Sequence, residues 1–130
     1  MSGDELIRQF EDGTTSAATF HHADHVRLAF EYLCRYSALE ALQRFSAALQ
    51  RFAAAQGKPQ LYHETITWAC LLLIGERLAR AGGTQGWEAF AARNADLFVW
   101  KGGVLATLYY QETLDSDLAR HTFVLPDRRG

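Results

Sequence analysis

The spacing of hydrophobic residues predicts helices along nearly the whole chain. Between Ser37 and residue 56, apolar residues recur at intervals of three and four, the pattern of an amphipathic helix. Ser37 followed by Glu40 matches the S-x-x-E capping box and predicts the start of this helix. Residues 56–59, with the sequence QGKP, predict its end. The apolar stripe consists of Leu39, Leu42, Phe45, Leu49 and Phe52.

Similar patterns predict further helices, and no segment has the alternation typical of a strand. We expect helices over residues 4–10, 21–36, 63–81, 87–91, 94–109 and 113–121. Thr19 and Asn94 would act as N-caps. Gly102 and Gly103 fall inside one predicted helix, where each costs about 1 kcal/mol relative to alanine, so a kink or a close approach is expected there.

The expected fold is all-α, a single-domain helical bundle spanning residues 1–130. Three to four main helices would form the bundle, with short helices toward the C-terminus. Residues 123–126, with the sequence FVLP, form an apolar segment that we call the C-terminal strap and expect to dock on the bundle.

Composition and charge narrow the possible partners. The chain has 48% hydrophobic residues and a net charge of −2, so it lacks the basic surface typical of a nucleic-acid-binding protein. The longest apolar run, around residues 68–75, is too short to cross a membrane. The acidic N-terminal segment does not resemble a targeting peptide, and Cys34 and Cys70 are expected in the core. These features predict a soluble, cytoplasmic protein.

Three of the five histidines cluster in residues 19–26, with the sequence TFHHADHV. On a helical wheel, His22 falls in the middle of the apolar arc and His25 lies beside it, while His21 lies nearer the edge. Histidines three or four positions apart share one helix face, so two of their imidazoles can bind one ion. The cluster therefore predicts histidines that face the interior.

The helix predicted over residues 63–81 carries a matching feature. Its apolar arc includes Glu64, with His63 at the edge. A carboxylate directed into an apolar face is costly unless it is paired or bound to a metal. We therefore expect the inward histidines of the earlier helix to be the partners of Glu64.

Together these residues predict a mononuclear metal site between two helices. His22, His25 and His63 are the favoured nitrogen ligands, with His21 as the substitute for His22. Glu64 would be an oxygen ligand or the catalytic base. The donor set suits a divalent transition metal, and Zn, Fe, Mn, Ni and Cu all remain open. An enzyme of this kind would act on a small molecule by metal-assisted chemistry, with hydrolysis, lyase and oxygen chemistry all open.

Metal-free alternatives use the same residues. A His–Glu pair can act as a general base, or the histidines and Glu64 can form a buried hydrogen-bond network in a small-ligand-binding or protein-interaction module. A homodimer through the C-terminal strap would suit such a module. Tyrosines would assist the acid–base chemistry, and tryptophans would line a small-molecule pocket. The tyrosines are Tyr62, Tyr109 and Tyr110, and the tryptophans are Trp68, Trp87 and Trp100. Glu64 can also lie in the first turn of a helix, where the helix N-terminus stabilises a carboxylate without any partner histidine.

Three short segments carry a resemblance to known sequences. They are FHHADH at residues 20–25, YHETIT at 62–67 and FVLPDR at 123–128. Together they resemble a small bacterial all-helical family of unassigned function. The resemblance implies a bacterial helical domain and implies no particular activity, cofactor or substrate.

Overall fold

The computed structural model describes residues 2–16, 18, 20–82, 86–99 and 103–128. All regular elements of these residues are helical, which confirms the predicted all-α bundle. They are α1 (Gly3–Glu11), α2 (His22–Arg35), α3 (Ala38–Ala55), η1 (Pro59–Leu61), α4 (Glu64–Arg80), α5 (Trp87–Arg93), η2 (Ala95–Phe98), α6 (Val104–Leu108), α7 (Gln111–Leu114) and α8 (Asp117–His121).

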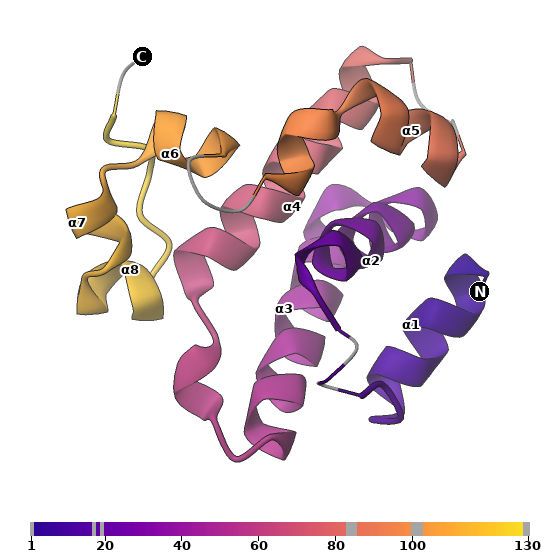
Figure 1. Cartoon of the computed structure of the whole chain (residues 1–130), viewed down its shortest axis with the longest axis horizontal. Coiled ribbons are helices and arrows are strands. Elements are labelled where there is room, and N and C mark those ends of the chain that lie inside the picture. The colour runs from indigo at the N-terminus through magenta and orange to yellow at the C-terminus, as the bar shows by residue number, and fades with distance from the viewer. Residues whose placement is uncertain (1, 17, 19, 83–85, 100–102, 129–130) are drawn as a thin grey trace.

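Helices α2, α3 and α4 pack against one another and form the centre of the bundle. Helix α1 packs on α2, and α8 packs on α4. Figure 1 shows α1 and the short helices α6–α8 on opposite sides of this centre. The main core lies among α1–α5 and η2, and a smaller cluster of Ala69, Tyr109 and Leu114 joins the C-terminal helices to α4.

The ends of α3 confirm the boundaries predicted from the sequence. Ser37 Oγ accepts a hydrogen bond from the backbone N–H of Glu40 at 3.2 Å. At the other end, the N–H of Lys58 donates to the carbonyl of Ala53 at 3.0 Å, and Gly57 has a φ of 72°. This is a Schellman ending, which favours glycine because other residues are strained at positive φ.

Helix α2 begins one residue later than predicted, because His21 is its N-cap. The backbone N–H of His21 donates to the Asp24 carboxylate at 2.9 Å. The proposed cap Thr19 lies outside the described residues. This start leaves His22 and His25 within the helix, as the wheel requires.

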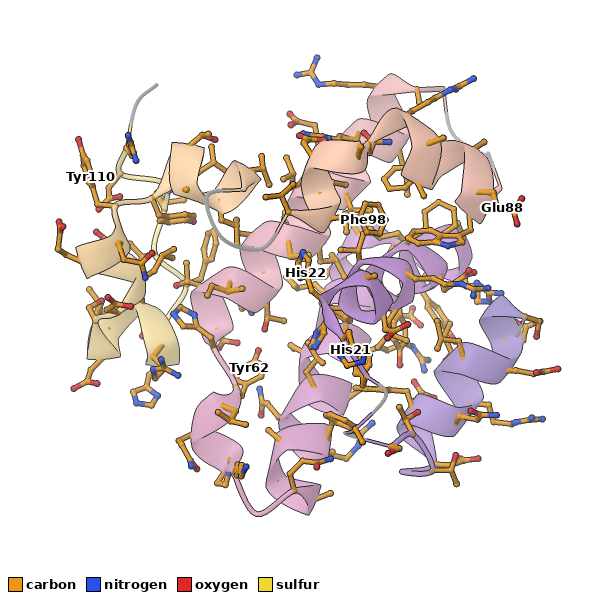
Figure 2. All side chains as sticks on the ribbon, viewed as in Figure 1. His21, His22, Tyr62, Glu88, Phe98 and Tyr110 are labelled. Atoms are coloured by element: carbon orange, nitrogen blue, oxygen red, sulfur yellow. The ribbon has the colours of Figure 1, made fainter. Side chains whose placement is uncertain are left out.

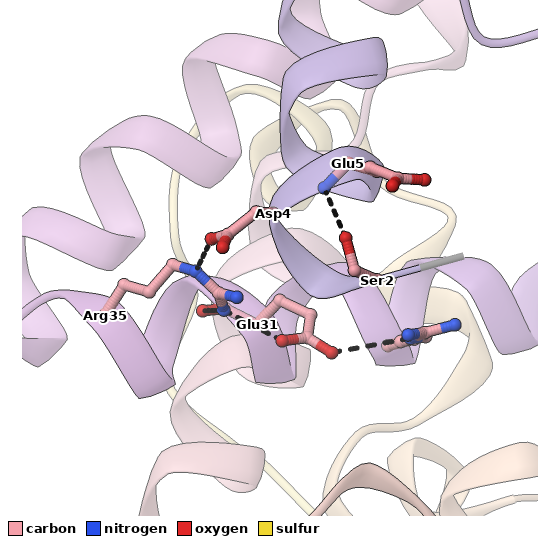
Figure 3. A network of polar contacts seen from close by, with 6 residues as sticks. Ser2, Asp4, Glu5, Glu31 and Arg35 are labelled. Carbon is pink, nitrogen blue, oxygen red and sulfur yellow. Dashed lines mark hydrogen bonds and ion pairs between the residues drawn. The ribbon is translucent and has the colours of Figure 1, made fainter.

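Glu31 lies on the polar arc of α2, yet the structure buries it, because α1 covers that side of the helix. Its carboxylate accepts from Arg35 Nη1 at 2.8 Å and from Arg27 Nε at 3.4 Å, and Arg35 Nε also donates to Asp4 at 2.8 Å (Figure 3). A Cβ at Gly3 would lie only 2.1 Å from Glu31 Oε1. The absence of a side chain at residue 3 therefore lets α1 approach this ion-pair network.

The single helix predicted over residues 94–109 is wrong, because η2 and α6 are separate elements. Asn94 does not cap with its side chain; instead its Nδ2 donates to the Phe90 carbonyl at 2.8 Å. A Cβ at Gly103 would lie 1.9 Å from the carbonyl oxygen of Val99, so the chain makes a close approach here. Gly102 lies outside the described residues.

The helix predicted over residues 113–121 is likewise two elements, α7 and α8. They are parted at Asp115 and Ser116, and the Ser116 hydroxyl accepts from the N–H of Ala119 at 3.1 Å to begin α8. A serine N-cap in the middle of the segment was the sequence signal for this break.

The C-terminal strap docks on α4, as predicted. Phe123 stacks on Trp68 with ring centroids 5.1 Å apart. The buried Thr65 hydroxyl donates to the carbonyl of Thr122 at 2.8 Å and accepts from the N–H of Val124 at 3.1 Å. The Tyr109 hydroxyl donates to the Val124 carbonyl at 2.6 Å. The side chains of Thr65 in α4 and of Tyr109, which follows α6, therefore bind the backbone of the strap and of the residue before it.

Three hydrophobic or cysteine positions differ from the sequence-based interpretation. Leu39 is 69% exposed although it belongs to the apolar stripe of α3. Cys34 is exposed, and Cys70 is only partly covered. A wheel drawn for one helix does not define how far its neighbours cover each position. Within the described part of the chain, none of the helices combines the length and the apolar character needed to cross a membrane.

Candidate functional site

A cavity of about 650 Å³ lies among α2, α3, α4, η2, α6 and α8. Its volume is in the range of roughly 300–1,000 Å³ that is typical of small-molecule sites. Most of its wall is apolar. Representative apolar residues are Phe45, Leu49 and Phe52 from α3, Leu73 from α4, Leu97 from η2 and Val104 from α6.

The helical repeat explains how α3 and α4 form two walls of this cavity. On α3, Phe45, Leu49 and Phe52 are spaced by four and three positions and so share one face. On α4, the residues that line the cavity repeat in the same way but include polar side chains; they are Ile66, Thr67, Cys70 and Leu73. An apolar wall therefore faces a mixed one.

His22 lines the cavity and connects α2 to η2. Its Nε2 lies 2.8 Å from the carbonyl oxygen of Leu97, and because a carbonyl only accepts, this nitrogen carries the proton and donates. Figure 2 shows His22 in the middle of the molecule, where these elements meet. His22 thus helps to hold η2 against α2 at the edge of the cavity.

His25 lines the same cavity and is stacked on Phe20, with ring centroids 4.4 Å apart. The pKa of His25 is lowered from 6.5 to about 4, mainly by burial and in part by the nearby His22, while Asp24 opposes the shift. Within the described residues, no hydrogen bond joins its ring nitrogens to another group. At neutral pH, His25 is therefore an uncharged imidazole that presents one donor and one acceptor.

His63 is the N-cap of α4, and both of its ring nitrogens are used. Its Nδ1 accepts from the N–H of Ile66 at 3.1 Å, and its Nε2 donates to the carbonyl of Leu114 at 2.7 Å. Burial lowers the pKa of His63, with Arg120 acting in the same direction against the opposing hydrogen bond to Leu114. His63 is therefore a neutral imidazole that caps α4 and fixes α7 to it.

Glu64 does not pair with the inward histidines, contrary to the expectation from the wheel. Its Oε1 accepts from the Tyr62 hydroxyl at 2.5 Å and from Trp68 Nε1 at 2.9 Å. Burial, together with this hydrogen bond to Glu64, raises the pKa of Tyr62 to about 12. Tyr62 lines the cavity and is labelled in Figure 2, whereas Glu64 is not among the described lining residues. Glu64 thus orients a tyrosine of the wall.

The donors predicted to bind a metal do not fit one in this arrangement. Among the described residues, no group of three or more His, Cys, Asp or Glu side chains is placed to hold a metal ion. Both nitrogens of His63 are occupied, Glu64 is bound by two donors, and His21 is exposed at the start of α2. The geometry of the described residues does not support the metal site, and its ligands and Glu64 as catalytic base stay predictions from the sequence.

Arg120 was missed by the sequence analysis because α8 reaches the cavity only through tertiary packing. It lines the cavity, and its Nη1 donates to the carbonyl of Gln60 at 2.9 Å. Cys70 was missed as a wall residue, although its spacing from Thr67 was a usable signal. Burial raises the pKa of Cys70 to about 12, so its thiol is uncharged at neutral pH.

Most of the aromatic residues predicted to act in a pocket lie elsewhere in the structure. Tyr109 is buried against the strap, and Tyr110 is exposed far from His22 in Figure 2. Trp68 and Trp87 pack against the main core. Trp100 lies outside the described residues. Tyr62 is the tyrosine from this set that lines the cavity.

Comparison with known proteins identifies no relative of this chain: no protein-family model, curated protein or solved structure matches it. The resemblance to a small bacterial family stays a prediction.

Proposed function

We propose that this protein binds a small, mainly apolar molecule in the central cavity, without a metal. The single observation that supports this most strongly is the cavity itself, with its large volume and its mainly apolar wall. A few polar groups among apolar residues are typical of a small-molecule site. This proposal corresponds to the small-ligand-binding alternative drawn from the sequence.

The protonation states of the wall suit an uncharged ligand body. His25 and His63 both have lowered pKa values, and the thiol of Cys70 has a raised one. Neutral side chains avoid the large cost of desolvating a charge when a ligand displaces water. These three side chains therefore place no charge beside the apolar part of a ligand.

A second apolar hollow, between α2 and α4, is less suited to this role. Its volume is about 270 Å³, and Leu33, Tyr36, Leu72 and Gly75 are part of its wall. It is smaller than a typical small-molecule site. The central cavity is therefore the site that we assign to the ligand.

Binding can be tested with N-phenyl-1-naphthylamine, a neutral apolar dye whose fluorescence rises in an apolar environment. We expect a saturable rise with wild-type protein. Ala53→Phe adds a large side chain at a residue that lines the cavity, and we expect it to weaken binding by roughly tenfold or more, equivalent to about 1.4 kcal/mol.

Ala54→Phe is the matched control, because Ala54 is exposed and lies outside the cavity wall. Leu49→Trp, also in the wall, provides a second test if Ala53→Phe fails to fold. Circular dichroism would establish that each variant retains its helices. A dye that binds equally well to wild type, to the folded wall variants and to the control would contradict the proposal.

A further inference from the structure

The charges around the central cavity identify the class of ligand more narrowly. We infer that the cavity binds an amphiphile with one carboxylate, whose head is held by Arg120 and whose apolar body lies against the walls formed by α3 and α4. This inference rests on the proposed function, since it names the kind of molecule that the cavity binds.

Arg120 is the one permanently charged side chain among the described residues that line the cavity. No Asp or Glu is present in that part of the wall. No carboxylate of the described chain lies within ion-pair distance of Arg120 either. By contrast, Arg35 and Arg77 each bind a carboxylate. Arg120 therefore brings an uncompensated positive charge to an apolar cavity.

The hydrogen bonds of Arg120 leave donors for a ligand. Among the described residues, the guanidinium donates to the Gln60 carbonyl through Nη1, and this bond ties α8 to η1. A guanidinium has five N–H donors in a planar fork that matches a carboxylate. The contact with Gln60 positions the group, and its other donors can bind the two oxygens of a carboxylate.

The charge balance favours a carboxylate over a more highly charged head. One guanidinium balances one negative charge, and the described wall has no lysine or second arginine for a dianion such as a phosphate monoester. The neighbouring His63 does not add a positive charge, because both of its nitrogens are engaged in the neutral form. The apolar residues of α3 then suit the remainder of the molecule.

Calorimetric titrations with four ligands of equal chain length test this inference. They are decanoate, decanol, decylamine and decyl phosphate. We expect wild-type protein to bind decanoate roughly tenfold or more tightly than decanol, because a charge-assisted bond to arginine adds to the same apolar contacts. Added salt should weaken the binding of decanoate and leave that of decanol nearly unchanged.

Arg120→Gln should reduce the affinity for decanoate to about that for decanol, with decanol binding unaltered. Arg93→Gln makes the same charge change at an exposed residue of α5 outside the cavity and should have no effect. Arg120→Lys keeps the charge and should keep a preference for decanoate, even if Arg120→Gln disturbs α8.

The outcomes separate the two proposals. If decanol and decanoate bind equally to wild type, or if Arg120→Gln retains the preference for decanoate, the role of Arg120 is refuted while the apolar cavity remains a binding site. Tighter binding of decyl phosphate or decylamine than of decanoate would overturn the carboxylate assignment. If none of the four ligands binds, the proposed function itself fails.

Discussion

The buried His25 predicts a specific dependence of stability on pH. Its pKa is about 4 in the folded protein, against an ordinary value of 6.5, because burial disfavours the charged imidazole. Each pKa unit corresponds to about 1.4 kcal/mol of differential interaction. The difference between the pKa of 6.5 in the unfolded chain and about 4 in the folded protein therefore corresponds to about 3 kcal/mol of stability.

The sign of the effect follows from which state binds more protons. Between pH 6.5 and about 4, the unfolded chain protonates His25 while the folded protein does not. Stability thus falls as the pH is lowered through this window, and the contribution of His25 is fully present above pH 6.5. The lowered pKa of His63 acts in the same direction.

Urea unfolding at several values between pH 7.5 and pH 4 measures this contribution directly. The relevant quantity is the difference in unfolding free energy between wild type and His25→Gln, because the carboxylates titrate in both proteins. As the pH falls from 7.5 to 4, we expect wild type to lose about 3 kcal/mol of unfolding free energy relative to His25→Gln. His121→Gln removes an exposed histidine and serves as the control.

A difference that stays constant with pH would refute the reasoning. It would mean that His25 is charged or well solvated in the folded protein, and that His25 is not a neutral part of the cavity wall. The control variant distinguishes this result from a general effect of removing a histidine.

Three further predictions concern other parts of the fold. Gly103→Ala should destabilise the protein by roughly 1–3 kcal/mol in urea unfolding, because its Cβ would meet a backbone carbonyl. A Cβ at Gly86 would meet no atom within 4 Å, so Gly86→Ala should have a much smaller effect, and equal losses would contradict the close approach at Gly103. Thr65→Val should lower the unfolding free energy by roughly 1–3 kcal/mol and speed amide exchange in the C-terminal strap, because the hydroxyl that binds the backbone there is lost. Thr65→Ser should keep the wild-type stability and exchange rate, and slow exchange in Thr65→Val would contradict the role of the Thr65 hydroxyl. Ellman's reagent should react faster with the exposed Cys34 than with the partly covered Cys70, although burial raises the pKa of both thiols; equal rates would contradict this difference in accessibility.

The sequence predicts the first four helices well because their ends are encoded locally. Ser37 caps α3, and Gly57 ends it with positive φ, independently of distant contacts. The wheel of α2 also places His22 and His25 toward the interior, where the structure has them lining the cavity. Local chemistry and helical periodicity are sufficient for these features.

Features that depend on neighbouring elements were not predictable in this way. The burial of Glu31 requires α1 to cover the polar side of α2, and the role of Arg120 requires α8 to reach the cavity. Glu64 is the opposite case: its partners, Tyr62 and Trp68, are local, two and four positions away, although the wheel suggested a histidine of another helix. Periodicity indicates which side chains face inward, but it does not indicate whether they fill the space between them.

The most direct test of the account is to locate a bound neutral ligand by NMR. On titration with decanol, we expect saturable shifts of the His25 imidazole C–H signals and of the Ile66 and Thr67 methyl signals, since all three residues line the central cavity. The methyl signals of Leu33 and Leu72, in the smaller hollow between α2 and α4, should stay unchanged. Shifts confined to Leu33 and Leu72, or no saturable shift at His25, Ile66 and Thr67, would contradict binding in the central cavity.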